Sequence, residues 1–311
     1  IAMRGLCIEG VAGEQMLHRE LLRQLACDAK GAAGGGGHPR ARQAQARMIF
    51  AEGDDPRVLR AAVAYQRAGL GRALVVGREA DVREKLDSVG LHDAVRELEI
   101  VNAANTRHLD QYKDFLYQRL QREGFDRHDI HRLAARDRHV FSALMLQHGH
   151  GDGLVTGATR KSAHVLSLIN HVFDAKAADG AVGVTALLHK GRIVLIADTL
   201  VHEWPNEQDL AVIATKAAGV ARSLGLEPRV AFVSFSTFGY PVSERATKMH
   251  MAAKVLDDMK VDFEYEGEMT VDVALNAQAM MQYPFCRLSG PANILVVPAR
   301  HSASISVKLM Q

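Results

Sequence analysis

Short apolar runs alternate along this chain with longer stretches in which apolar residues recur every three or four positions. Runs of the first kind predict buried strands, and stretches of the second kind predict amphipathic helices. In the first half, the predicted strands are 48–50, 73–76, 98–101 and 153–156. The helices predicted with them are 55–68, 80–89, 109–122 and 128–147. This βαβα alternation indicates an α/β fold with a mainly parallel sheet that is covered on both faces.

The second half continues the alternation, with one antiparallel exception. Two apolar runs, 182–188 and 192–197, flank Lys190-Gly191 and predict a β-hairpin. The further strands predicted are 230–235, 261–265 and 294–297. The further helices predicted are 162–173, 206–224, 243–259 and 271–281. The chain is long enough for two domains of ordinary size.

The first 46 residues do not follow this pattern. Residues 14–27 predict a short amphipathic helix, and a glycine-rich stretch, 31–39, follows it. No strand precedes these glycines and Pro39 blocks an immediate helix, so the stretch favours a flexible linker over a dinucleotide-binding loop. We interpret 1–46 as a partly flexible linker to an upstream domain.

Four short polar segments each follow a predicted strand: 156–160, 234–239, 266–269 and 298–304. In an open α/β sheet, loops at the carboxyl ends of the strands line the ligand crevice. Glycine and small hydroxyl residues there let backbone N–H groups approach an anion. A ligand that carries phosphate is therefore expected. The candidate binding residues are Thr156, Gly157, Thr159, Arg160, Ser234, Ser236, Thr237, Arg300, Ser302 and Ser304.

Each candidate has a purely structural alternative. The hydroxyl of Thr159 can cap the next helix, and the hydroxyls after strand 230–235 can satisfy local backbone groups. Arg300 and His301 can form an exposed basic turn instead of facing phosphates. The acidic group of Glu266, Glu268 and Asp272 can supply a metal site or acid–base chemistry, but capping of the following helix is the favoured interpretation.

No metal site and no catalytic residue are assigned. The histidine pairs at 128 and 131 and at 148 and 150 lack a clear third ligand, so we interpret them as solvated helix and loop residues. Trp204, the lone tryptophan, lies in a loop and is a candidate for an interface.

Composition narrows the class of protein. The chain has 38 Lys and Arg against 36 Asp and Glu, which argues against a dedicated nucleic-acid binder. Its three cysteines form no paired motif and are typical of reduced thiols in a cytoplasmic protein. No apolar run approaches the length of a membrane span, so no membrane partner is expected. The chain begins with Ile1, as expected of an excised domain.

Several segments resemble the phosphate acetyl/butyryltransferase family. These are Asp-Gly-Leu-Val-Thr-Gly-Ala-Thr-Arg at 152–160, Glu-Pro-Arg-Val-Ala at 227–231 leading into 234–239, and Gly-Pro-Ala-Asn-Ile-Leu-Val-Val-Pro at 290–298. The segments at 197–199, 262–269 and 282–288 resemble one branch more closely, the C-terminal transacetylase-like domain of NADP-dependent malic enzymes. The resemblance covers about residues 47–311.

The resemblance implies a phosphotransacetylase-like architecture of two α/β domains with mainly parallel sheets and a cleft between them, related to isocitrate and isopropylmalate dehydrogenases. Domain one would be 47–160 plus 301–311, and domain two 161–300. Lys308 matches a lysine of the family and would hold the same end of the ligand. The implied partners are acetyl-CoA or acyl phosphate, and a second copy of the chain that forms a homo-oligomer, a dimer through domain two.

The resemblance also implies weak or absent turnover. The Asp and Arg that act in active transferases follow a Ser-Arg-Gly segment that would lie beyond Gln311. Ala299 replaces the usual Asp, and Phe235 and Phe238 depart from the usual loop. We therefore expect an acetyl-CoA-binding regulatory domain of a malic enzyme, with NADP and a divalent metal bound only upstream. The alternatives are a working phosphate acetyltransferase and a scaffold that only oligomerises.

Overall fold

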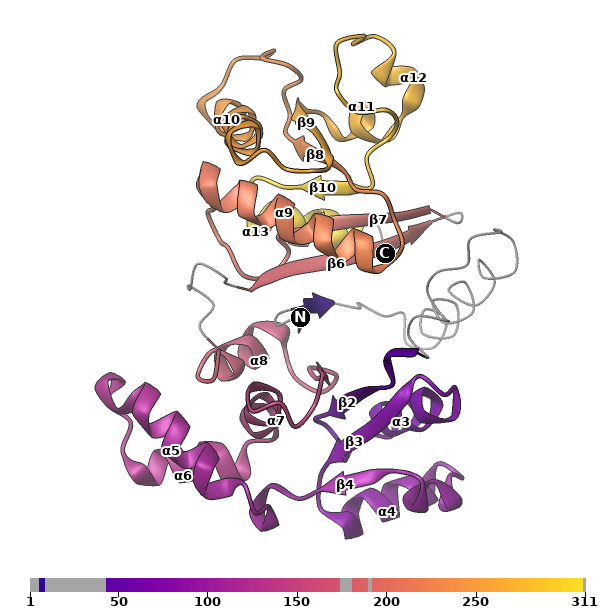
Figure 1. The fold of residues 1–311 in the computed structure, drawn as a ribbon, viewed down its shortest axis with the longest axis vertical. Coiled ribbons are helices and arrows are strands. Elements are labelled where there is room, and N and C mark those ends of the chain that lie inside the picture. Colours follow the sequence, from indigo (N-terminus) through magenta and orange to yellow (C-terminus); the bar gives the residue numbers. More distant parts are fainter. Residues whose placement is uncertain (1–5, 9–42, 174–180, 190–191, 310–311) are drawn as a thin grey trace. The chain divides into compact units, whose positions relative to one another are not determined.

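The computed structural model describes residues 6–8, 43–173, 181–189 and 192–309. The chain divides between residues 177 and 178 into two compact units, each built around its own sheet (Figure 1). We call the part within 38–177 the first unit, and the part that contains 178–311 the second unit. The α/β fold with mainly parallel sheets is as the sequence predicts.

The first unit is a four-stranded parallel sheet in the order β4-β3-β2-β5. Its strands are β2 (Ala46–Phe50), β3 (Gly71–Val76), β4 (Glu99–Val101) and β5 (Gly153–Val155). Its α-helices are α3 (Pro56–Arg67), α4 (Glu79–Ser88), α5 (Leu109–Leu120), α6 (Arg127–Arg136), α7 (Arg138–Gln147) and α8 (Ser162–Ile169). Short 3₁₀ turns lie at His92–Arg96, Ala103–Asn105 and Gln121–Glu123.

Helix α3 shows how local sequence fixes an element. The Asp55 carboxylate accepts from the backbone N–H of Arg57 at 2.8 Å, and Pro56 occupies the first turn, where no N–H is needed. The buried face of α3, which includes Leu59, Ala62 and Val63, packs with Phe50 and the other buried side chains on one face of the sheet. Burial of each large side chain stabilises the fold by about 1.5–3 kcal/mol.

The single helix predicted at 128–147 is wrong, because the chain forms two helices there. Asp137 ends α6 in an extended conformation and its carboxylate accepts from the N–H groups of His139 and Val140, which starts α7. An aspartate is better placed at such a cap than inside a helix, because it competes for backbone hydrogen bonds.

The second unit is a six-stranded sheet in the order β1-β6-β7-β10-β8-β9. Its strands are β1 (Leu6–Ile8), β6 (Val182–His189), β7 (Arg192–Ala197), β8 (Arg229–Val233), β9 (Glu264–Met269) and β10 (Ile294–Val296). Its helices are α9 (Glu207–Ser223), α10 (Glu244–Met259), α11 (Val271–Leu275), α12 (Ala277–Met280) and α13 (Arg300–Leu309). The predicted hairpin is confirmed, since β6 and β7 pair antiparallel, and the other pairings are parallel.

The linker predicted at 1–46 needs a correction at its start and its end. Residues 6–8 form β1, which pairs with β6, and Ala46 already belongs to β2. The helix predicted at 14–27 and the glycine-rich stretch at 31–39 lie outside the described residues.

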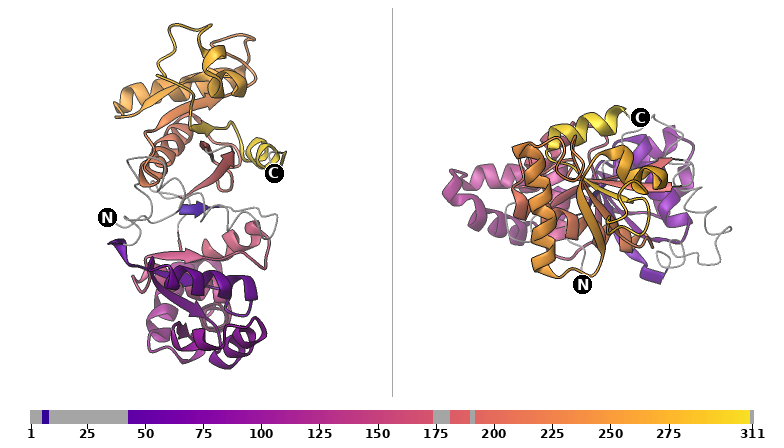
Figure 2. Two further views of the ribbon diagram at one scale, coloured as in Figure 1. Left: turned by 90° about the vertical axis from the view of Figure 1, so that its right-hand side faces the viewer. Right: turned by 90° about the horizontal axis from the view of Figure 1, so that it is seen from above.

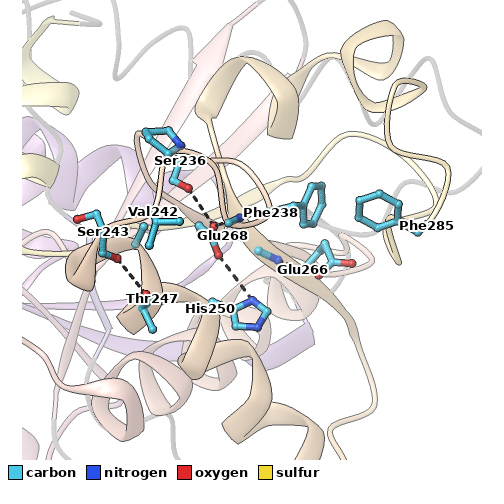
Figure 3. A pocket seen from close by; sticks show the side chains of 13 residues that line it. Ser236, Phe238, Val242, Ser243, Thr247, His250, Glu266, Glu268 and Phe285 are labelled. Atoms are coloured by element: carbon cyan, nitrogen blue, oxygen red, sulfur yellow. Dashed lines mark hydrogen bonds and ion pairs between the residues drawn. The ribbon is translucent and has the colours of Figure 1, made fainter.

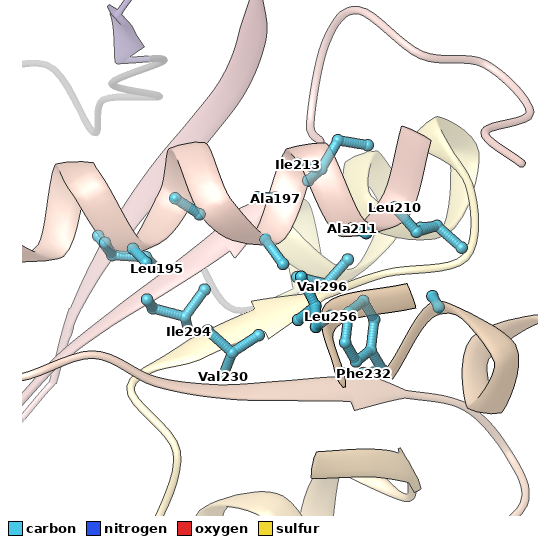
Figure 4. Packing of buried hydrophobic residues seen from close by; sticks show 14 of the residues in the cluster. Leu195, Ala197, Leu210, Ala211, Ile213, Val230, Phe232, Leu256, Ile294 and Val296 are labelled. Atoms are coloured by element: carbon cyan, nitrogen blue, oxygen red, sulfur yellow. The ribbon is translucent and has the colours of Figure 1, made fainter. Parts of the chain in front are cut away.

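The two faces of the second sheet bury alternate residues of the same strands. Leu195, Val230 and Ile294 pack with α9 and α10 on one face, as Figure 4 shows (Figure 4). Their neighbours Ile196 and Leu295 pack on the opposite face with the buried side chains of α11, α12 and α13. The left view of Figure 2 shows α13, in yellow near the C-terminus, on the other side of this sheet from α9. A strand that is buried on both faces has a continuous apolar sequence. For this reason the apolar runs of the sequence predicted β7, β8 and β10.

Two of the segments expected to be loops are regular structure. Strand β9 includes all of 266–269, and α13 begins at Arg300, so 300–304 is helical. The strand predicted at 261–265 begins and ends too early, since β9 is Glu264–Met269. Glu266 and Glu268 argue against a buried strand as long as their hydrogen-bond partners are unknown. The helix predicted at 271–281 is divided at Asn276, whose side chain caps α12.

The units also differ from the expected domains. Helix α8, expected in domain two, packs against α7 in the first unit. Helix α13, expected to complete domain one, buries Ala303 and Val307 in the core of the second unit. In both cases the apolar side of the helix is covered by the neighbouring elements of its own unit.

Candidate functional site

Strands β7, β10, β8 and β9 run parallel, so their carboxyl ends meet at one edge of the second unit's sheet. The segment that holds Ser234, Ser236 and Thr237 leaves β8 there. Helix α13, which holds Arg300 and the remaining candidates, follows β10 at the same edge. The second unit therefore brings these two groups of candidates to one edge, as expected for the ligand side of an α/β sheet.

A pocket of about 500 Å³ opens beside β8, β9 and α10 at this edge (Figure 3). Its volume lies in the range of small-molecule sites. Thirteen residues line it: Ser236, Phe238, Gly239, Pro241, Val242, Ser243, Ala246, Thr247, His250, Glu266, Gly267, Glu268 and Phe285.

Glu268 is the central polar group of this pocket. Its side chain is buried, and its Oε1 accepts from the Ser236 hydroxyl at 3.0 Å and from the Gly239 N–H at 2.6 Å. Its Oε2 lies 3.6 Å from Nδ1 of His250, whose side chain is half exposed. The hydroxyl of Ser236 is therefore already paired with a carboxylate. The sequence analysis favoured a helix cap for this acidic group, but Glu268 instead holds the segment after β8, and Thr270 at the start of α11 makes no side-chain capping hydrogen bond.

Glu266, the second carboxylate of the pocket, is held by Arg287. It accepts from the Arg287 backbone N–H at 2.9 Å and from Nη2 at 3.3 Å. Arg287 also pairs with Asp257 at 2.6 Å and lies over the Tyr265 ring. The hydrogen bond from the Tyr265 hydroxyl, together with Arg287, lowers the pKa of Asp257. These contacts fix the segment that carries Phe285 against β9.

Aromatic rings form another wall of the pocket. Phe238 and Gly239 both have positive φ, 49° and 91°, which turns the segment back toward β9. The Phe238 ring lies 4.8 Å from that of Phe285 and 5.1 Å from that of Tyr283. Because Phe238 lines the pocket, it also limits the room for a ligand there.

The other candidates after β8 connect neighbouring segments. Thr237 donates from Oγ1 to Oγ1 of Thr270 at 3.2 Å and accepts from the Thr270 N–H at 3.1 Å. Ser234 is half-buried, and its backbone N–H donates to Met269. Thr237 therefore has a structural role, whatever else it binds.

The candidates on α13 divide between two sides of the helix. Arg300, Ser304 and Lys308 are spaced by four residues and share one side, whereas Ser302 is rotated away from them. The Arg300 guanidinium lies 3.5 Å from the Leu200 carbonyl and 3.5 Å from the Glu203 carboxylate.

Trp204, considered above for an interface, lies close to the start of α13. Its ring is 62% exposed and lies 4.9 Å from that of His301.

The loop after β7 is held by a buried carboxylate, Asp198. It accepts five hydrogen bonds, four from backbone N–H groups and one from Nδ1 of His202 at 2.6 Å. Burial raises the pKa of Asp198, but the hydrogen bonds from His202 and the backbone outweigh it, so the net pKa is lowered. The hydrogen bond to Asp198 raises the pKa of His202.

In the first unit, an internal carboxylate occupies the donors of the segment that holds Thr156, Gly157 and Thr159. Glu52, fully buried after β2, accepts from the N–H of Ala158 at 2.8 Å, from the N–H of Thr159 at 2.9 Å, and from the Thr159 hydroxyl. Gly157 makes the turn with φ +89°. The sequence analysis did not identify Glu52, which lies over a hundred positions from these donors.

The first and last candidates of this segment have neighbours of their own. Thr156 Oγ1 lies 2.6 Å from Nδ1 of His139, a fully buried histidine whose pKa is lowered by burial. Arg160 is exposed, and its Nη1 lies 3.2 Å from Nε2 of His164. Arg160 is thus the member of this segment whose charge is best placed to meet a ligand from solvent.

The histidine pairs need one correction. His128 and His131 are exposed, as expected, but His148 and His150 are half-buried against Tyr112. The Tyr112 hydroxyl lies 2.5 Å from Nδ1 of His150. Within the described ranges, no three His, Cys, Asp or Glu side chains are grouped to hold a metal ion.

The fold and the sheet edge define the class of protein. The chain belongs to the phosphate acetyl/butaryl transferase family, whose model matches residues 38–311. A phosphotransacetylase from Streptococcus pyogenes has a similar structure, with a TM-score of 0.78 and 25% identity over 93% of this chain and 86% of that one. The family resemblance predicted from the sequence is confirmed.

Within this class, malic enzymes are among the most similar relatives. The NADP-dependent malic enzyme of Rhizobium meliloti (strain 1021) is 48% identical over 272 residues, which is 88% of this chain and 36% of that enzyme. The phosphate acetyltransferase of Thermoanaerobacterium thermosaccharolyticum is 28% identical over 88% of this chain and 84% of that enzyme. The chain thus spans about a third of the malic enzymes it matches. No helix in the described part is long and apolar enough to cross a membrane.

Proposed function

We propose that this chain is the acetyl-CoA-binding regulatory part of an NADP-dependent malic enzyme. In this proposal, malate is oxidatively decarboxylated to pyruvate by another part of the same protein, which also holds NADP and the divalent metal. The observation that carries the proposal is the 48% identity to a malic enzyme, against 28% to a phosphate acetyltransferase over the same share of this chain.

The end of β10 supports binding without turnover. Ala299 occupies the position where the resemblance to active transferases places an aspartate, and it is 2% exposed. A buried methyl group can neither take a proton nor stabilise a charge. The adjacent Arg300, with Ser304 and Lys308 on the same side of α13, offers two cations that suit the phosphates of coenzyme A.

Regulation requires a difference in affinity between two states of the whole enzyme. A ligand changes activity only as far as it binds one state more tightly than the other, typically by 1–3 kcal/mol, or about 5–150-fold. We propose that acetyl-CoA supplies this difference, and that the protein acts in the cytoplasm.

The test uses the parent enzyme. Malate decarboxylation is titrated with acetyl-CoA, and binding is measured by isothermal titration calorimetry. We expect saturable binding, and a change in activity that is removed by the double charge reversal Arg300→Glu with Lys308→Glu. Arg192→Glu with Lys260→Glu, which alters two charges elsewhere in the second unit, should leave it unchanged. Absence of heat with acetyl-CoA would contradict the proposal.

A phosphate acetyltransferase is the second candidate, favoured by the family match over residues 38–311. It is tested by supplying acetyl phosphate and coenzyme A and following acetyl-CoA. We expect no turnover above background. A turnover rate in the usual enzyme range, about 1–1000 per second, would mean that the chain is a catalyst and not a regulatory part.

We also propose that the second unit forms a dimer with a second copy of the chain, which can accompany either function. Large apolar side chains are exposed on this unit, among them Tyr240 at 84% and Met281 at 73%. A surface with many exposed apolar side chains is typical of protein–protein contacts. Sedimentation velocity should give twice the mass of one chain, and a monomer at micromolar concentration would refute the dimer.

A further inference from the structure

The pocket beside β8, β9 and α10 has a composition that does not suit a phosphate. Its thirteen lining residues include two carboxylates, Glu266 and Glu268, and neither Lys nor Arg. Both carboxylates are buried and fixed by hydrogen bonds. Glu266 is paired with the Arg287 guanidinium, whereas the ion pair of Glu268 is with His250, which also lines the pocket. An anion beside Glu268 would be repelled at short range, and salt would screen this repulsion only weakly.

The same pocket suits an uncharged chain with apolar branches. Phe238 and Phe285 form an aromatic wall, and Val242 and Pro241 add aliphatic surface at the mouth. Its volume of about 500 Å³ has room for a ligand fragment of more than ten heavy atoms.

One polar group in the pocket is positioned to recognise an amide or a thioester carbonyl. The Nδ1 atom of His250 faces Glu268 at 3.6 Å, so its Nε2 points away from the carboxylate (Figure 3). Within the described ranges, Nε2 makes no hydrogen bond to the protein. Glu268 is itself held by Ser236 and Gly239, so it orients the histidine ring from a fixed position.

We propose that this pocket binds the pantetheine arm and the acyl group of the thioester ligand, with His250 Nε2 donating to one of its carbonyl oxygens. The arm carries two amides, a hydroxyl and a gem-dimethyl group, and no charge, so it matches the aromatic walls and avoids repulsion by Glu268. The phosphates lie outside the pocket. This inference rests on the proposed function, because it names the part of acetyl-CoA that the pocket holds.

The test compares three probes with this chain: acetyl-CoA, S-acetylpantetheine, which lacks phosphates, and adenosine 3′,5′-bisphosphate, which lacks the arm. Val242→Trp fills the mouth of the pocket. The matched control is Val271→Trp, since Val271 is also exposed but does not line the pocket. Dissociation constants are measured by calorimetry.

We expect Val242→Trp to weaken acetyl-CoA and S-acetylpantetheine by about tenfold or more and to leave adenosine 3′,5′-bisphosphate unchanged, because only the first two carry the arm. His250→Gln should weaken the same two probes, whereas His131→Gln, at an exposed histidine of α6, should weaken none. Val271→Trp should match the unaltered chain.

Two failures are distinguishable. If the unaltered chain does not bind acetyl-CoA, the proposed function falls and this inference falls with it. If acetyl-CoA binds and Val242→Trp leaves its affinity within about twofold of the unaltered chain, the proposed function stands and the arm lies elsewhere. Equal weakening of all three probes would also overturn the inference, because the pocket would then not distinguish the arm from the nucleotide.

Discussion

At the scale of the residue, buried carboxylates are the recurring feature of this protein. Glu52, Asp198 and Glu268 are each almost fully buried, and each accepts hydrogen bonds from backbone N–H groups and a neighbouring side chain. A buried charge is tolerated only where such donors surround it. The sequence analysis identified the donors Thr159 and Ser236, but did not pair them with Glu52 and Glu268, because the partners are distant in sequence.

Replacement of Glu52 should destabilise the first unit. Glu52→Ala removes the acceptor of two backbone N–H groups and of the Thr159 hydroxyl. These hydrogen bonds are partly buried, so water does not fully replace the lost acceptor. We expect a loss of about 2–4 kcal/mol in the free energy of unfolding, measured by urea denaturation. The control Glu79→Ala, at an exposed position of α4, should change it by less than about 0.5 kcal/mol. A similar small change for Glu52→Ala would show that the donors find other partners.

The pair of His202 and Asp198 should make stability depend on pH. The pKa of His202 is raised from 6.5, so its contribution is fully present below pH 6.5 and is lost as pH rises through the raised value. The pKa of Asp198 is lowered from 3.8, so its contribution is present above pH 3.8 and is lost only in stronger acid. The cost of His202→Gln should therefore be larger at pH 5.5 than at pH 9.

The measurement is urea denaturation of both chains at the two pH values. His131→Gln serves as the control and should show no difference between them, since this histidine is exposed on α6. Equal costs of His202→Gln at pH 5.5 and pH 9 would mean that the pair does not change its protonation on unfolding.

At the scale of the element, caps explain both the correct and the incorrect predictions. The sequence analysis predicted helix 206–224, and in the structure Asn206 and Asp209 form a capping box at the start of α9. The boundaries at Asp137 and Asn276 were missed, although each is also a capping residue. In all three places a short polar side chain follows or interrupts an apolar pattern. Periodicity alone does not show whether such a residue ends one helix or lies on its exposed side.

Loss of the cap of α9 should cost a measurable part of the stability. In Asn206→Ala the Asp209 N–H loses its acceptor, which lies at 2.8 Å. We expect the free energy of unfolding to fall by about 1 kcal/mol, and Asn206→Asp to retain most of it because the carboxylate can accept the same bond. Equal losses in the two variants would show that the side-chain acceptor is not what stabilises the start of the helix.

At the scale of the whole molecule, each unit has its own buried core. In the first unit one such cluster contains Ile49 and Phe141, and in the second unit one contains Phe232 and Ile294. Both sheets have apolar side chains packed on both faces. Each unit therefore has what a domain needs to fold around its own sheet.

A cavity in one core should mainly loosen that unit. Phe232→Ala removes a fully buried ring from the second unit and should cost about 3–5 kcal/mol. Native-state hydrogen exchange should show faster exchange in β8 and β10, with little change in β2 and β3. The reciprocal variant, Phe141→Ala, should have the opposite pattern. Equal acceleration in both units would show that they unfold as one.

The sequence by itself determined the α/β class, the family, and the position of most strands and helices. Apolar periodicity, capping residues and turn glycines act over a few neighbouring residues, so a linear pattern contains them. The tertiary structure alone decided that Glu52 occupies the donors after β5, that Glu268 lies beside His250, and that α8 and α13 belong to units other than those expected. These features depend on which distant side chains share a buried volume, and there the pairing of charge with donors, not local pattern, determines which arrangement is stable.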